Sequence, residues 1–190
     1  MTREEWLVAA VDAMRPWFEV ERSPLPAAVR ASCGWPSSKG LSASRRRIGE
    51  CWDSKASAAG VSEVFISPCL DDPAKVLDVL THELVHAAVG VQQGHKGPFR
   101  KVAKALGLEG KMTATHAGPQ LAERLNALAG KLGPYPHSAL DQTARKKQST
   151  RLLKATCQGC GFTARVTRQW AEYGLPICVC GNQIELESGA

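Results

Sequence analysis

The chain has 190 residues, of which 44% are hydrophobic, and a formal net charge of +6. This length suits one domain of about 140 residues with its own core and a small appendage. No apolar run reaches the ~18 residues that a membrane span needs. The first 18 residues also lack the basic start and unbroken apolar core of a signal peptide. We therefore expect a cytoplasmic protein.

The first third of the chain predicts a helix followed by short strands. An amphipathic pattern over residues 1–18 predicts an N-terminal helix within residues 1–22, which ends near Pro16 or soon after. Runs of strand-forming residues follow, separated by turns rich in proline, glycine and serine. They span residues 29–35, 47–52 and 61–67. A small sheet accompanied by helices gives an α+β fold.

A second helix is predicted from Pro73 to about residue 90. Asp72 is a good N-cap, and a proline at the first helical position costs no hydrogen bond. Apolar residues then recur at three- and four-residue spacing. Gly90 marks the C-terminal end of the helix.

This helix carries the most informative motif of the chain, His-Glu-Leu-Val-His at residues 82–86. Residues four apart lie on one face of a helix, so His82 and His86 can bind one metal ion together. Glu83 can act as the general base of a zinc peptidase. The pattern therefore predicts a catalytic zinc site. The alternative is a buried core helix with two hydrogen-bonded histidines.

Catalytic zinc usually has three protein ligands, and His95 is the best candidate for the third. Gly90 and Gly94 precede it and allow the chain to turn back toward the helix. A further apolar-periodic segment, residues 97–107, predicts a helix that packs behind the site. The other residues considered as third ligand are Glu109, Glu123, His116 and His137.

After residue 106 we expect a glycine-rich loop and then a helix from Pro119 to Leu132. A linker over residues 141–152 separates the first domain, residues 1–140, from the C-terminal segment. Three cysteines outside the C-terminal segment are expected to be buried, reduced thiols: Cys33, Cys51 and Cys69.

Residues 61–99 resemble the SprT-like metallopeptidase family, to which the Spartan proteases of DNA–protein crosslinks also belong. Three features carry the resemblance: a strand ending in Ile-Ser-Pro at residues 66–68, the motif at residues 82–86, and a glycine-preceded histidine followed by Gly-Pro-Phe at residues 97–99. Family members tend to have a histidine–glycine pair at this last place, and here Lys96 interrupts the pair.

The resemblance implies both a fold and a site. The fold is zincin-like, with a small sheet packed on the helix that carries the motif. The resemblance further implies that His82, His86 and His95 bind zinc and that Glu83 is the general base. The implied activity is hydrolysis of peptide bonds.

Four cysteines near the C-terminus predict a structural zinc ribbon over residues 153–190. Cys157 and Cys160 have C-x-x-C spacing, and Cys178 and Cys180 follow after 17 intervening residues. The second pair has one residue between its cysteines where a knuckle normally has two. Two redox pairs or simple buried thiols are the alternatives. SprT-like proteins often carry such a ribbon after the peptidase domain.

Residues 144–171 contain seven basic residues and no acidic one. This distribution predicts a positive field around the basic linker and the ribbon, which suits DNA better than a neutral partner. A second basic run is residues 45–47. The alternative for both groups of basic residues is that they form a solvated surface and do not bind DNA. The candidate contacts with DNA are Arg165, Arg168, Trp170 and Lys154.

These patterns together predict a zinc-dependent endopeptidase that acts on DNA-associated proteins. It would hold one catalytic and one structural zinc ion, with a protein substrate and DNA as partners. The alternative is a non-proteolytic, zinc-containing DNA-binding adaptor or regulatory protein. The sequence leaves the oligomeric state open.

Overall fold

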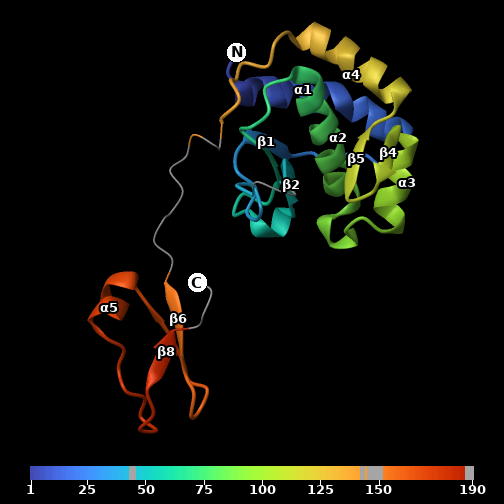
Figure 1. Cartoon of the computed structure of the whole chain (residues 1–190). Helices are drawn as coiled ribbons and strands as arrows, with labels where there is room; N and C mark the ends of the chain where they lie inside the picture. The colour runs from blue at the N-terminus through green and yellow to red at the C-terminus, as the bar shows by residue number, and fades with distance from the viewer. Residues whose placement is uncertain (43–45, 142–143, 145–151, 187–190) are drawn as a thin grey trace. The chain divides into compact units, whose positions relative to one another are not determined.

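The computed structural model describes residues 1–42, 46–141, 144 and 152–186. The chain forms two compact units, Met1–Gln142 and Thr143–Ala190 (Figure 1). Helices and strands occur in both units, so the chain is mixed α+β, as the sequence predicts. None of the helices in the described ranges has the length and apolarity that crossing a membrane requires.

The first unit is built on a three-stranded sheet with the order β1-β3-β2. Its strands are β1 (Val29–Cys33), β2 (Gly49–Trp52) and β3 (Ser62–Ile66). They confirm the three predicted strands, with slightly shorter bounds. β1 runs parallel to β3 and β2 runs antiparallel to it, which leaves β2 at one edge of the sheet. Ala31 of β1 and Val64 and Ile66 of β3 are buried in the core, whereas Phe65, between the last two, is only partly buried.

The N-terminal helix α1 (Arg3–Val20) packs on the sheet beside β1. Thr2 and Glu5 form a capping box at its start. The helix ends at Val20, soon after Pro16 and within residues 1–22 as predicted, so Pro16 lies inside its last turns. Trp17 and Phe18 are buried there, and burying two large aromatic side chains outweighs the single hydrogen bond that a proline removes.

The motif helix α2 (Pro73–Val89) confirms the predicted bounds. Asp72 accepts a hydrogen bond from the backbone N–H of Lys75 at 2.7 Å, and Gly90 ends the helix with a φ of 90°. The helix α4 (Pro119–Leu132), also as predicted, crosses α2 and α1 on the side away from the sheet (Figure 1). α2 is therefore enclosed between the sheet and α4.

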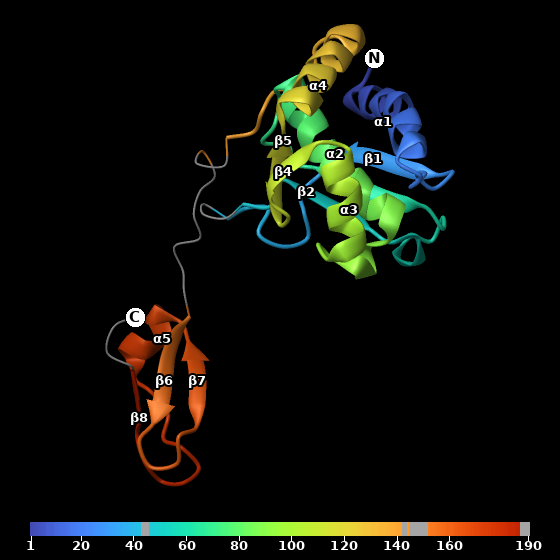
Figure 2. The same cartoon turned by 90° about the vertical axis from the view of Figure 1, so that its right-hand side faces the viewer.

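The segment that follows α2 differs in part from the expectation. The 3-10 turn η2 (Val91–Gln93) leads into α3 (Gly97–Ala105), the predicted helix. The predicted glycine-rich loop after it is instead a hairpin of β4 (Leu108–Lys111) and β5 (Ala114–Ala117). Burial of Leu108 anchors the hairpin against the core. Figure 2 shows it beside α2 and α3.

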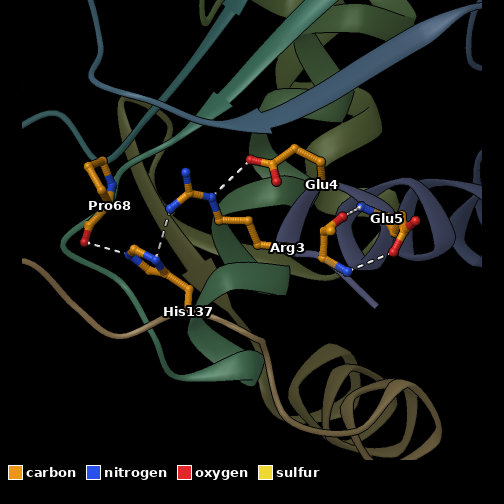
Figure 3. A network of polar contacts seen from close by, with 6 residues as sticks. Arg3, Glu4, Glu5, Pro68 and His137 are labelled. Carbon is orange, nitrogen blue, oxygen red and sulfur yellow. Dashed lines mark hydrogen bonds and ion pairs between the residues drawn. The ribbon is translucent and has the colours of Figure 1, made fainter.

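Polar contacts fasten the segment after α4 to the rest of the first unit. His137 donates from Nε2 to the carbonyl oxygen of Pro68 at 2.9 Å, and Arg3 Nη1 lies 3.2 Å from His137 Nδ1 (Figure 3). Tyr135 is buried edge-on against Trp6, with ring centroids 5.0 Å apart. His137 thus links the end of this unit to its beginning through Nδ1 and to the segment after β3 through Nε2.

The second unit is a three-stranded antiparallel sheet with the order β7-β6-β8. Its elements are β6 (Leu153–Cys157), β7 (Thr163–Val166), α5 (Arg168–Tyr173) and β8 (Ile184–Leu186). The buried cluster between them is small: Ala155, Cys157, Cys178 and Ile184. An apolar cluster of this size cannot stabilise a fold by itself, so the unit depends on a cross-link of another kind.

Candidate metal centres

Three histidines of the first unit converge on one point. His95 Nε2 lies 3.2 Å from His82 Nε2 and 3.2 Å from His86 Nε2. His82 and His86 come from one face of α2, as their spacing predicts. Gly94, with a φ of 53°, turns the chain after η2 so that His95 points back at α2. The arrangement could hold one metal ion.

Phe99 supports all three imidazole rings from behind. This residue of α3 is fully buried, and its ring centroid lies 4.9, 4.4 and 4.9 Å from those of His82, His86 and His95. An aromatic wall restricts how far each imidazole can rotate. The predicted helix behind the site therefore has a specific role in holding the cluster together.

Burial keeps the histidines in the form that binds metals. It lowers the pKa of His82 to about 4, with a further contribution from His95. It lowers the pKa of His86 to about 3, helped by the charges of His82 and His95. The pKa of His95 is also lowered, by burial and then by Arg47. All three rings are consequently neutral near pH 7, and a neutral imidazole has the lone pair that a metal requires.

Glu83 lies beside the histidines in a cleft of about 780 Å³. Its carboxylate is buried, and this burial raises its pKa to about 8, while the charge of Arg47 acts in the opposite direction. A β-carbon added to Gly49 of β2 would lie 2.5 Å from Glu83 Oε1. The glycine at this place in β2 is therefore what leaves room for the Glu83 side chain.

The other residues considered as third ligand do not join the cluster. Within the described ranges, the histidine group consists of His82, His86 and His95 alone. Glu109 lies in β4 and Glu123 in α4, and His137 is engaged with Arg3 and Pro68. His116 lies on β5, outside the group.

The sequence patterns missed two contributors to this site, Gly49 and Thr115. Gly49 was placed only within a strand, and no local signal pairs it with Glu83. Thr115 Oγ1 lies 2.7 Å from His82 Nδ1, and its segment was expected to be a loop. Recognising either residue requires knowing which strand lies against α2.

The four cysteines of the second unit form another group that could hold a metal ion. Cys157 Sγ lies 3.5 Å from Cys180 Sγ, and Cys160 Sγ lies 3.5 Å from Cys178 Sγ. All four sulfur atoms lie within 4.8 Å of one another. The single residue between Cys178 and Cys180 thus does not prevent both thiols from reaching the group. Asn182 donates from Nδ2 to Cys180 Sγ at 3.5 Å. This bond, the backbone of Asn182 and the thiols of Cys157 and Cys160 together lower the pKa of the Cys180 thiol to about 6.

The candidate DNA-contact residues lie on the strands and helix of the second unit. Lys154 of β6 and Arg165 of β7 are direct cross-strand neighbours. Arg168 and Trp170 lie on α5, where the Trp170 ring is 62% exposed and packs 5.7 Å from that of Tyr173. Most of the predicted basic linker, residues 142–143 and 145–151, lies outside the described residues, and so does Arg45 of the second basic run.

No family model, curated protein or solved structure matches this chain. Its class is accordingly defined by the fold and the two clusters. It is a mixed α+β chain with a three-histidine group and a four-cysteine group, and each group could hold a metal ion.

The two clusters predict two bound metal ions per chain. We expect His86→Ala to lose one equivalent and Cys160→Ser to lose the other, because each substitution removes one of three or four ligands. Metal content can be measured by plasma mass spectrometry on purified protein. His116→Ala is the matched control and retains both equivalents. If either ligand variant still bound two ions, the corresponding cluster would not be a metal centre.

Proposed function

We propose that this chain is a zinc-dependent endopeptidase of the SprT-like family with a zincin-like fold. The observation that carries the proposal is the convergence of three imidazoles, with His95 Nε2 3.2 Å from the Nε2 atoms of His82 and His86, beside a buried glutamate in an open cleft. A structural metal centre has no need of a carboxylate held in this position. A catalytic centre needs a base at this place.

The residues of both clusters fit zinc. Three nitrogen atoms at the usual zinc distance would lie about 3.3 Å apart in tetrahedral geometry, and four sulfur atoms about 3.8 Å apart. In the chain, His95 Nε2 lies 3.2 Å from each of the other two Nε2 atoms, two of the sulfur pairs lie 3.5 Å apart, and all ligand atoms of each group lie within 4.8 Å of one another. His82, His86 and His95 would hold the catalytic ion, and the four cysteines the structural one. When bound, zinc supplies Lewis-acid chemistry that polarises a peptide carbonyl and acidifies water.

Glu83 performs the proton transfers in the proposed reaction. The charge of a bound zinc ion would favour the ionised form of Glu83 and offset the effect of burial on its pKa. The carboxylate then accepts a proton from the water molecule whose oxygen attacks the peptide carbonyl carbon. The same side chain then returns that proton to the amine nitrogen as the carbon–nitrogen bond breaks. The narrow space between Gly49 and the carboxylate keeps Glu83 in one orientation through both steps.

β2 is the strand best placed to bind an extended substrate. It lies at an edge of its sheet with β3 as its neighbour, and Gly49, Glu50 and Cys51 contribute to the wall of the cleft. The free backbone groups of an edge strand can pair with a peptide strand, which would lie across the histidines.

Glu83→Gln tests the proposed activity. The amide keeps the size of the side chain but cannot accept the proton, so we expect cleavage of a denatured protein substrate to fall by at least about a hundredfold. Zinc content should persist at two equivalents. The rate is measured by gel electrophoresis of the substrate over time.

Glu123→Gln, on the exposed side of α4, is the matched control and should cleave at the wild-type rate. Undiminished cleavage by Glu83→Gln would refute the role of Glu83. Zinc binding without any cleavage by the wild-type chain would favour a non-proteolytic adaptor.

We further propose that the second unit binds DNA and directs the peptidase to proteins held there. Two observations support this function: Trp170 is exposed, and the cations Lys154 and Arg165 lie opposite each other on β6 and β7. An aromatic ring stacks on bases without sequence preference, and cations track the phosphates.

Trp170→Ala tests this second proposal. Removal of a stacking ring should weaken binding of the full chain to a single-stranded oligonucleotide by about 5- to 100-fold. Fluorescence anisotropy at fixed salt measures the affinity. Val20→Ala, which shortens an exposed apolar side chain of α1, is the control and should bind normally. Equal affinities for Trp170→Ala and wild type would exclude Trp170 from the DNA-binding surface.

A further inference from the structure

The outer ring nitrogen of His82 has a partner that comes from outside the motif. His82 Nδ1 lies 2.7 Å from Thr115 Oγ1, a residue 33 positions further along the chain. Thr115 belongs to β5, the second strand of the hairpin that follows α3. The two side chains meet because β5 packs against α2.

The direction of this hydrogen bond follows from what the other ring nitrogen does. His82 Nε2 points at His86 and His95 and must carry a lone pair if it is to bind a metal ion. A neutral imidazole has one proton, which then sits on Nδ1. His82 Nδ1–H therefore donates and Thr115 Oγ1 accepts. The bond selects the tautomer whose Nε2 is ready to bind.

His86 provides an internal contrast. Its Nδ1 is buried and has no hydrogen-bond partner in the described part of the chain. Packing on Phe99, with ring centroids 4.4 Å apart, restrains this ring instead. Of the two histidines on α2, His82 alone has its outer nitrogen restrained by a hydrogen bond within the described residues. The hydrogen bond to Thr115 thus restrains the orientation of the His82 ring in a way that α2 itself does not.

The hairpin holds Thr115 in a fixed place. The register pairs Leu108 with Ala117 and Gly110 with Thr115. Leu108 is buried, and Gly118 donates from its backbone N–H to Gly107 at 2.8 Å, which closes the base of the hairpin. Thr115 and Ala117 lie two residues apart and share one side of the strand. Ala117 packs on the core, so Thr115 faces inward with it.

We propose that Thr115 is a positioning residue of the histidine metal centre: its hydroxyl fixes the tautomer and the ring orientation of His82, and so raises the affinity for zinc. Such hydrogen bonds to a ligand histidine typically contribute 10- to 100-fold in metal affinity. The inference rests on the zinc binding proposed for the three histidines and not on peptide hydrolysis.

Thr115→Val and Thr115→Ser together test the inference in the full-length chain. Valine keeps the branched shape and suits a strand but has no hydroxyl, whereas serine retains the hydroxyl. Proton–nitrogen NMR spectra of the histidine rings are recorded while a chelator buffers the free zinc concentration. These signals report the histidine centre separately from the cysteines, and they also identify the tautomer of His82.

We expect Thr115→Val to bind zinc about 10- to 100-fold more weakly at the histidines and Thr115→Ser to bind as wild type does. Metal-free wild type should show His82 protonated on Nδ1. Circular dichroism and the urea midpoint of the metal-free variants should stay close to wild type, which separates positioning from folding. Thr113→Val, in the exposed turn of the same hairpin, is the control and leaves the affinity unchanged.

Equal zinc affinity for Thr115→Val and wild type would overturn the inference. It would also be overturned if Thr115→Ser were as weak as Thr115→Val, or if His82 were protonated on Nε2 in the metal-free chain. If zinc left the histidine signals of wild type unmoved, the metal centre itself would be refuted together with the inference. Normal zinc binding without any cleavage by the wild-type chain would refute the proposed peptidase activity but not the inference about Thr115.

Discussion

Three imidazoles whose Nε2 atoms converge on one point are the constraint on which the rest of this structure depends. Nitrogen atoms 3.2 Å apart with like partial charges repel one another unless a proton or a cation lies between them. Burial disfavours protonation of these rings. A bound metal cation resolves the conflict, because it satisfies three lone pairs at once.

Much of the first unit can be understood as support for that arrangement. α2 is buried against the sheet and α4, so His82 and His86 cannot move apart. α3 brings Phe99 against the three rings, and the hairpin brings Thr115 to His82. A metal centre is most rigid when its ligands lie on packed elements and their outer atoms are restrained as well.

The second unit also has a group that could hold a metal ion, built from thiols in place of imidazoles. Its buried apolar cluster is too small to stabilise a fold, and two of the four residues in it, Cys157 and Cys178, are themselves cysteines. The remaining thiols, of Cys160 and Cys180, are exposed at the turns. A metal held by all four would replace the missing core, so removal of the ion should unfold this unit first.

Local signals were sufficient to predict the motif helix and the placement of His82 and His86 on one face of it. Asp72, Pro73 and Gly90 bound α2 through capping chemistry that needs no tertiary contact, and the spacing of His82 and His86 follows from helical geometry. The local signal of Pro16 places the end of α1 only approximately, because burial of Trp17 and Phe18, which extends the helix to Val20, is a tertiary effect. The hairpin of β4 and β5 was missed for the same reason, and Thr115 with it. Gly49 was assigned to a strand, but its contact with Glu83 depends on how the sheet packs on α2.

The histidine centre can be tested most directly by diffraction from crystals of the full chain, measured on both sides of the zinc absorption edge. The account predicts an anomalous peak about 2.0–2.1 Å from the Nε2 atoms of His82, His86 and His95. It would be contradicted by a zinc-loaded crystal with no peak between these three residues, or by a peak there whose third protein ligand is Glu109 or His116 in place of His95.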